Sequence, residues 1–235
     1  MNIRRGIGLF GGTFDPVHNG HLCVAREALR AMPLARVDFV LAPRPWQKAV
    51  ATPVEERLAM LEEAVADEPM LGVSLLEVMR EGDTYTIDTL KEMRALTGPS
   101  TPLVLIIGAD QWRNLHTWRD WRAFPEYAHI ALCNRAGSDP GAAAPEVLAA
   151  FENRRCSPGA LSGSPCGGLA QFSIPEHAAS STKIRELFAA LPPTEALHQL
   201  ETWLPVRVAR RIARRGLYAR PGVLETQLAA QDQRP

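Results

Sequence analysis

Hydrophobic residues in the first half of the chain form short continuous runs that alternate with stripes of helical spacing. The continuous runs predict buried strands, and the clearest is Leu103 to Ile107, which leads directly into Gly108. The stripes predict amphipathic helices, and Thr52-Pro53 ahead of one of them predicts a capping box. Further strands are predicted over residues 7–10, 37–42, 73–78 and 129–133, and helices over residues 21–30, 54–65 and 86–96. This alternation is typical of an α/β fold with helices on both faces of a parallel sheet.

The pattern changes after residue 135. Glycine, alanine, proline and serine dominate residues 136–168, which predicts a variable surface excursion. Helical spacing returns from residue 180 to residue 218, and residues 221–235 are expected to be a flexible tail. We therefore expect one domain over residues 1–220, a Rossmann-like doubly wound parallel sheet with a small C-terminal helical segment.

Composition narrows the class of protein. The chain has 235 residues, of which 46% are hydrophobic and 22% charged, as in an ordinary globular domain. Its 26 Lys and Arg balance 26 Asp and Glu, which disfavours a dedicated nucleic-acid-binding protein. No hydrophobic run approaches the roughly 18–20 residues of a membrane span, and the start lacks the pattern of a signal peptide. The four cysteines lack metal-site or disulfide spacing, so a cytoplasmic protein is expected.

Two glycine-rich segments are candidates for phosphate binding. Residues 6–11 satisfy G-x-G-x-x-G, but the glycines lie inside the predicted strand, which disfavours a dinucleotide-binding turn. The sequence GGTFDPVHNGH at residues 11–21 is more specific, because paired glycines after a strand let the backbone approach a ligand closely. His18 and His21 then begin a helix, whose positive end favours anions and whose imidazoles add donors.

A second phosphate-binding segment is predicted near the C-terminus. Ser180, Ser181 and Thr182 precede a helical stripe, and their hydroxyls and the free N–H groups of the first turn suit a triphosphate. Lys183 and Arg185 add positive charge one turn into the helix. Alone, this segment is equally well explained as an ordinary helix cap. Its presence together with H-x-G-H favours the phosphate-binding interpretation.

These two segments resemble the signatures of the HxGH nucleotidyltransferase superfamily. From about residue 7 to residue 218, outside the excursion, the chain most resembles bacterial nicotinate-nucleotide adenylyltransferases. Beyond the two signatures, the matches are DTYTIDTL at 83–90, IIGAD at 106–110, HTW at 116–118 and LY at 217–218. The resemblance implies an enzyme of NAD biosynthesis that adenylylates nicotinate mononucleotide with ATP and releases pyrophosphate. The 5′-phosphate would attack the α-phosphate of ATP in line.

The resemblance also implies roles for particular residues. The expected catalytic residues are His18, His21 and Arg185. The residues expected to bind ATP and its phosphates are Gly11, Gly12, Thr13, Phe14, Lys48, Arg135, Ser180, Ser181 and Thr182. Those expected to bind nicotinate mononucleotide are Tyr85, Thr86, Gly108, Asp110 and Trp118, with the indole of Trp118 stacked on the pyridinium. Mg²⁺ is expected to arrive with ATP, with no metal ligands from protein side chains.

Alternatives remain open at this point. A related transferase could use nicotinamide mononucleotide or another phosphorylated acceptor, and a non-catalytic module could bind nucleotide alone. Arginines at helical spacing also offer a nucleic-acid surface, although a solvated helix face explains them better; they are Arg207, Arg210, Arg211, Arg214 and Arg215. The expected partners are ATP and nicotinate mononucleotide, without nucleic acid or membrane, and a homo-oligomer is left open.

Overall fold

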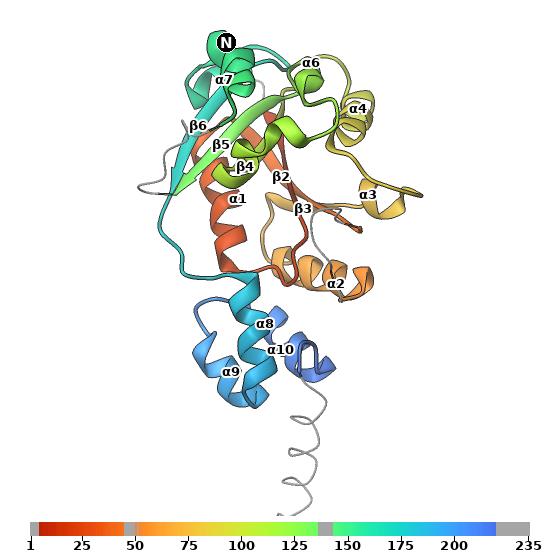
Figure 1. Cartoon of the computed structure of the whole chain (residues 1–235), viewed down its shortest axis with the longest axis vertical. Helices are drawn as coiled ribbons and strands as arrows, with labels where there is room; N and C mark the ends of the chain where they lie inside the picture. Colours follow the sequence, from red (N-terminus) through yellow and green to blue (C-terminus); the bar gives the residue numbers. More distant parts are fainter. Residues whose placement is uncertain (1–4, 45–49, 51, 136–142, 220–235) are drawn as a thin grey trace, which may run out of the picture. The chain divides into compact units, whose positions relative to one another are not determined.

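The computed structural model of the chain describes residues 5–44, 50, 52–135 and 143–219 (Figure 1). The chain divides into two compact units, each made of three segments. The first unit comprises residues 1–13, 23–49 and 68–176, and the second comprises residues 14–22, 50–67 and 177–235. Within the described ranges, no helix is long and apolar enough to cross a membrane. The predicted tail at 221–235 lies outside the described residues.

The first unit is built on a six-stranded sheet. Its strands are β1 (Gly6–Gly12), β2 (Leu34–Leu41), β3 (Leu71–Ser74), β4 (Leu103–Gly108), β5 (His129–Arg135) and β6 (Leu169–Ile174). They lie in the order β3-β2-β1-β4-β5-β6, and every neighbouring pair is parallel. This order confirms the predicted Rossmann-like α/β fold. The direction of strand addition reverses between β1 and β4, and sheets of this kind bind ligands beyond the carboxyl ends of the strands at that point.

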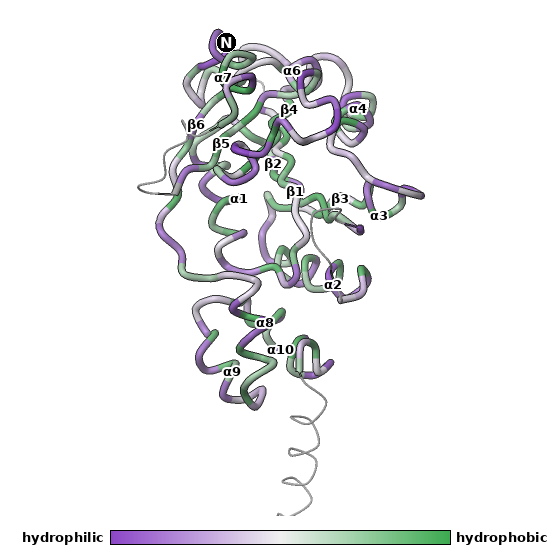
Figure 2. Tube along the Cα trace, viewed as in Figure 1, coloured by the Kyte–Doolittle hydropathy of each residue, from purple (hydrophilic) through white to green (hydrophobic). Residues whose placement is uncertain are grey.

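Helices of the first unit bury both faces of the sheet. They are α1 (Asn19–Ala31), whose first turn belongs to the second unit, α3 (Leu76–Met79), α4 (Thr86–Thr97), α5 (Ala109–Arg113), α6 (Phe124–Tyr127) and α7 (Pro145–Phe151). Alternate residues of the central strands, such as Leu9, Leu105 and Leu132, join one core cluster with α4, α6 and α7. The intervening residues Phe10 and Ile106 are buried as well. Both faces of the central strands are therefore buried, and β4 is hydrophobic without interruption up to Gly108 (Figure 2).

The described part of the predicted surface excursion contributes to the core. Val147 and Phe151 on α7 are buried, and the Phe151 ring packs edge-on against Trp112 at 5.3 Å between centroids. Leu161, on the 3₁₀ helix at Pro158–Gly163, is also buried. The apolar residues are spread over short helices between glycine, proline and serine, so no window shows a clear period.

Two local predictions were wrong. The strand predicted over 73–78 ends at Ser74, because the chain turns into α3 at Leu76. The capping box at Thr52 does not form: Pro53 is the N-cap residue of α2 (Val54–Val65), and no side chain caps that helix.

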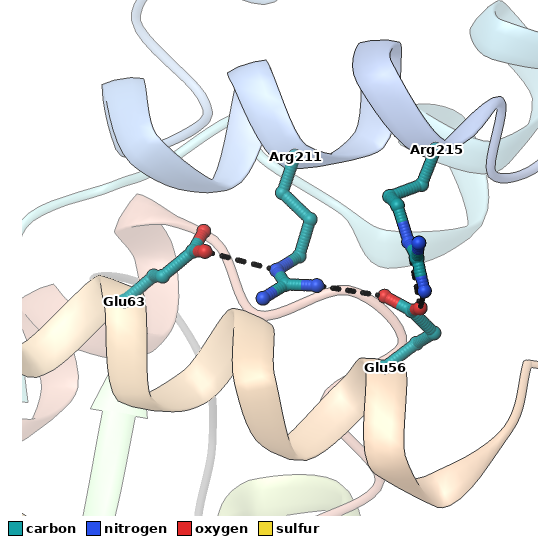
Figure 3. A network of polar contacts seen from close by, with 4 residues as sticks. All are labelled: Glu56, Glu63, Arg211 and Arg215. Atoms are coloured by element: carbon teal, nitrogen blue, oxygen red, sulfur yellow. Dashed lines mark hydrogen bonds and ion pairs between the residues drawn. The ribbon is translucent and has the colours of Figure 1, made fainter.

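The second unit is helical. Besides α2 it contains α8 (Ser181–Ala190), α9 (Pro193–Gln199) and α10 (Val206–Arg215), which follow the C-terminal pattern predicted from the sequence. Val208 and Ile212 are the buried residues of α10. On its polar side, Arg211 bonds both Glu56 and Glu63 of α2 at 3.0 Å, and Arg215 bonds Glu56 at 2.6 Å (Figure 3). These ion pairs tie α10 to α2.

Candidate active site

A pocket in the first unit lies at the carboxyl ends of β1 and β4, where the strand order predicts a ligand site. Its lining combines apolar and aromatic side chains with polar and charged ones, which can fix the orientation of a small molecule. The lining residues are Leu9, Gly11, Gly12, Thr13, Val40, Ala42, Arg44, Glu77, Thr84, Tyr85, Thr86, Thr89, Leu90, Leu105, Ile106, Ile107, Gln111, Trp118 and Arg119.

The pocket brings together two groups of residues predicted from the sequence. Gly11, Gly12 and Thr13 come from the end of β1, and Tyr85, Thr86 and Trp118 come from two later segments. Of the remaining predicted binding residues of this unit, Gly108 and Asp110 are not part of the lining. The Asp110 side chain is 91% exposed and pairs with Arg113 at 2.7 Å. Its role in binding nicotinate mononucleotide stays a prediction.

One wall of the pocket is aromatic and carries a positive charge. The guanidinium of Arg119 lies over the Tyr85 ring, with its Cζ 4.6 Å from the ring centroid. Trp118 packs edge-on against Phe124, with 6.2 Å between centroids, which holds the indole in place. The indole Nε1 is buried and has no hydrogen-bond partner in the described part of the chain. A buried donor without a partner is costly, so this wall favours a ligand or water that accepts a hydrogen bond.

Glu77 on α3 brings a buried carboxyl group to the pocket. Thr89 Oγ1 donates to Glu77 Oε1 at 2.8 Å, and Arg80 Nη1 donates to the same Thr89 hydroxyl at 3.1 Å. Burial raises the pKa of Glu77, while hydrogen bonds from Thr89 and Thr84 and the charge of Arg80 act in the opposite direction. Sequence reasoning missed Glu77. The only signal in the sequence was an acidic residue a few positions ahead of the DTYT segment.

Residues 14–21, called the H-x-G-H loop below, belong to the second unit: Phe14 to His18 precede α1, and Asn19 to His21 form its first turn. The imidazoles of His18 and His21 stack with centroids 3.7 Å apart, and the Phe14 ring meets His21 edge-on at 5.1 Å. The backbone N–H of His18 donates to Nδ1 of His21 at 3.2 Å. This bond makes Nδ1 the acceptor, so neutral His21 carries its proton on Nε2 and can donate from there.

The Ser/Thr turn at the start of α8 contacts this loop within the same unit. Ser181 Oγ donates to the carbonyl of Pro16 at 2.9 Å, and Arg185 Nη1 donates to the carbonyl of Asp15 at 2.6 Å. Arg185 Nη2 also reaches Thr182 Oγ1 at 3.5 Å. Ser180 is the N-cap residue of α8, and its side chain makes no capping bond. The structure thus brings the two predicted phosphate-binding segments together.

The structure does not test the predicted phosphate-binding roles of Lys48 and Arg135. Lys48 lies outside the described residues, and for Arg135 the structure describes only the backbone, at the end of β5. Among the residues described, no three His, Cys, Asp or Glu gather into a group that could hold a metal ion.

Three of the five arginines of α10 pair with carboxylates of α2 and its flank. Arg207 pairs with Asp67 at 2.9 Å, and Arg211 and Arg215 pair with Glu56 as described above (Figure 3). The Arg215 hydrogen bond is the main cause that lowers the pKa of Glu56. Arginines committed to carboxylates are poorly placed to neutralise nucleic-acid phosphates, which supports the helix-face interpretation.

Comparisons with known proteins agree with the resemblance. Residues 9–187 match the family described as cytidylyltransferase-like. A protein of Thermus thermophilus described as a probable nicotinate-nucleotide adenylyltransferase is 37% identical over 212 residues, covering 90% of this chain and 98% of that protein. One of the same description from Marinobacter nauticus is 35% identical over 206 residues, covering 83% and 94%. The solved structure of Plasmodium falciparum nicotinic acid mononucleotide adenylyltransferase complexed with NaAD has a TM-score of 0.69 at 15% identity and covers 91% of this chain and 97% of its own, which shows a common fold.

Proposed function

Because the chain belongs to the cytidylyltransferase-like family and, within it, to the nicotinate-nucleotide adenylyltransferases, we propose how its own residues carry out that reaction. The chain is an enzyme that transfers the adenylyl group of ATP to nicotinate mononucleotide, in NAD biosynthesis. The observation that carries this conclusion is 37% identity along 90% of the chain. Its products are nicotinate adenine dinucleotide and pyrophosphate.

The reaction needs positioning more than proton transfer. A 5′-phosphate oxygen of nicotinate mononucleotide attacks the α-phosphorus of ATP and forms a new P–O bond. The bond from that phosphorus to the oxygen bridging the α- and β-phosphates breaks, and pyrophosphate leaves with the electron pair. The attacking phosphate is already ionised near neutral pH, so no general base is required. Orientation and charge stabilisation supply the rate enhancement.

The H-x-G-H loop and the Ser/Thr turn are the proposed phosphate-binding groups of the second unit. His21 donates from Nε2 to an α-phosphate oxygen as charge develops there, and His18 keeps its ring aligned by stacking. Ser180, Ser181, Thr182 and Arg185 bind the β- and γ-phosphates at the start of α8. For Phe14 we propose a supporting role through its contact with His21.

The pocket of the first unit is the proposed binding site for the nicotinate nucleotide. Trp118 supplies a flat face for the pyridinium ring. Thr86 is the first residue of α4, where backbone N–H groups favour the nicotinate carboxylate. Arg119 places a cation at the same wall, which favours the acid over its amide. Gly11, Gly12 and Thr13 let a phosphate-bearing substrate approach the end of β1 closely.

The donors described here suit a metal that arrives with the nucleotide. Hydroxyls, imidazoles, guanidinium groups and helix N–H groups bind phosphate oxygens, whereas Mg²⁺ prefers carboxylates and water. Bound to ATP, Mg²⁺ supplies positive charge at the phosphate oxygens. The four cysteines are free thiols, which is typical of a reducing compartment, and we propose a cytoplasmic location.

The decisive experiment measures pyrophosphate release from ATP and Mg²⁺ with nicotinate or nicotinamide mononucleotide as acceptor. We expect faster release with the nicotinate form. Arg119→Gln should narrow that preference by about tenfold, the effect of one charge-assisted contact. Arg122→Gln is the matched control, because Arg122 also lies over an aromatic ring, that of Trp121, but does not line the pocket. Release with neither acceptor would contradict the proposal and favour a different phosphorylated acceptor or a binding module.

A further inference from the structure

Three polar side chains of the second unit, two of them buried and one half-buried, take no part in the mechanism above. Asp15 is 7% exposed, and the hydroxyl of Tyr218 donates to its Oδ1 at 2.7 Å. Arg57 on α2 is 1% exposed, and its Nε donates to the carbonyl of Thr52 at 3.2 Å. We call Asp15, Arg57 and Tyr218 the buried cluster. Ionised groups such as Asp15 and Arg57 are rarely buried to this extent unless opposite charges or hydrogen bonds offset the cost of removing them from water.

The members of the buried cluster compensate one another electrically. Burial lowers the pKa of Arg57, and the charge of Asp15 is the largest influence that opposes this shift. Burial and the neighbouring Asp15 carboxylate raise the pKa of Tyr218 far above its usual value, so its hydroxyl stays protonated and donates. The Thr52 side chain acts on the pKa of Tyr218 in the opposite direction. Loss of one member therefore leaves the others less well satisfied.

The cluster holds backbone that is unfavourable by itself. Phe14 has a φ of 46° and Tyr218 a φ of 68°, both in the left-handed region that bulky residues rarely adopt. Such conformations persist where the surroundings determine them. Phe14 directly precedes Asp15, and Tyr218 is bonded to Asp15. The Asp15–Tyr218 hydrogen bond thus links the two left-handed positions.

Asp15 lies only a few residues before the stacked histidines, His18 and His21, along the chain. The Asp15 carbonyl accepts from Arg185, the Pro16 carbonyl accepts from Ser181, and Val17 is fully buried. His18 follows directly, and its N–H fixes His21 through the bond to Nδ1. Backbone contacts to α8 hold one side of this segment. The Asp15 side chain supplies a separate anchor through Tyr218.

We propose that the buried cluster positions the H-x-G-H loop, and that Tyr218 is a positioning residue for adenylyl transfer. Its hydroxyl holds Asp15, and with it the backbone that carries His18 and His21, in the geometry needed to stabilise the α-phosphate. This inference rests on the proposed function of the two histidines. It also explains a motif that the mechanism leaves unused, the Leu217-Tyr218 pair.

The test is Tyr218→Phe, which removes one hydroxyl and keeps the ring. We expect kcat for pyrophosphate release to fall about tenfold, because small displacements of catalytic groups cost this much or more. The KM for nicotinate mononucleotide should stay unchanged, since its proposed pocket belongs to the first unit. The imidazole NMR signals of His18 and His21 should shift, while that of His129 in the first unit should not. The chain has six histidines, few enough to assign by substitution.

Matched variants separate positioning from stability. Tyr127→Phe removes a hydroxyl for which the described structure shows no hydrogen bond, and it should change neither kcat nor the histidine signals. Thr52→Val removes a hydroxyl whose influence on Tyr218 is weaker than that of Asp15, and it should give a smaller effect of the same kind. It keeps the test valid if Tyr218→Phe does not fold.

The outcomes distinguish this proposal from the one on which it rests. If Tyr218→Phe lowers only the unfolding temperature and leaves kcat and the histidine signals unchanged, the cluster is merely structural and the inference is overturned. If His21→Ala, assayed beside it, keeps full turnover, the proposed function of the histidines fails instead. The histidine NMR shifts would in that case still report whether Tyr218 positions the loop.

Discussion

The first unit's pocket and the second unit's histidine loop are built in different ways. The pocket draws side chains from the ends of strands and from α3, α4 and the segment around Trp118, and apolar, aromatic and polar side chains together shape its walls. The loop is fixed through its backbone: the carbonyls of Asp15 and Pro16 accept side-chain donors, and a backbone N–H orients His21. A site defined by side-chain shape suits recognition of a ring. A site fixed through backbone bonds suits charge stabilisation, where donors must not move. Substitutions in the pocket should therefore change KM, and substitutions in the loop should change kcat.

The largest effect on the reaction rate is expected for His21→Ala. We expect kcat to fall by about 10²–10³, the cost of losing one donor to developing charge, with little change in the KM for nicotinate mononucleotide. Steady-state pyrophosphate release measures both constants. His198→Ala is the matched control, because His198 is exposed on α9 of the same unit. A folded His21→Ala enzyme with normal kcat would contradict the role of the loop.

Trp118→Ala tests the pocket with a smaller expected effect. Loss of the stacking face should raise the KM for nicotinate mononucleotide about tenfold, in line with a desolvated cation–π contact of about 1–2 kcal/mol. The value of kcat at saturating substrate should change little. Trp118→Phe keeps a flat ring and should restore most of the affinity. A fall in kcat without a change in KM would mean that the indole acts on the reaction and not on ring binding.

The smallest expected effect is on the free energy of unfolding. It arises from His129, a histidine of the first unit for which we propose no role in the reaction. His129 is buried, accepts from the Gly168 N–H at Nδ1 and bonds the Ser164 carbonyl through Nε2, both at 2.9 Å. Burial lowers the pKa of His129, so below about pH 6.5 the unfolded chain binds the proton more readily than the folded chain. The free energy of unfolding should therefore decrease as the pH falls from about 7.5 to 5.5, with a slope of at most about 1.4 kcal/mol per pH unit, the limit for uptake of one proton.

Urea unfolding at the two pH values measures this decrease, and His129→Gln should show a smaller one. The comparison with the variant is needed because Glu77 contributes with the opposite sign. The raised pKa of Glu77 makes the folded state bind protons more readily than the unfolded state. The contribution of Glu77 to the free energy of unfolding therefore increases as the pH falls. An equal pH dependence in both proteins would rule out His129 as the source.

Sequence patterns predicted the fold well where hydrophobic residues form a continuous run or recur at a regular helical spacing. β4 lies where five consecutive apolar residues predicted it, and α4 follows its stripe from Thr86. β6 and α7 were missed because their apolar residues are separated by polar and helix-breaking ones. Local periodicity cannot detect elements that are stabilised mainly by the rest of the core.

The candidate site was predictable to the extent that its residues lie in contiguous motifs. The H-x-G-H loop and the Ser/Thr turn were found this way, and the structure joins them through Ser181. Arg119 and Glu77 were missed because their significance depends on neighbours that only the folded chain supplies, namely the Tyr85 ring and the Thr89 hydroxyl. The reverse also occurred, since Asp110 fits its motif but its side chain lies outside the pocket lining and is exposed.

The hydrogen bond between Tyr218 and Asp15 also has a consequence for biosynthesis on the ribosome. The two residues are 203 positions apart in the sequence. At a translation rate of about 5–20 residues per second, about 10–40 s pass between the synthesis of Asp15 and that of its partner. During that interval the nascent chain already contains both histidines but lacks the tyrosine that closes the contact. Synthesis of Tyr218, rather than folding of the N-terminal half, thus sets the earliest moment at which this loop can be fully anchored.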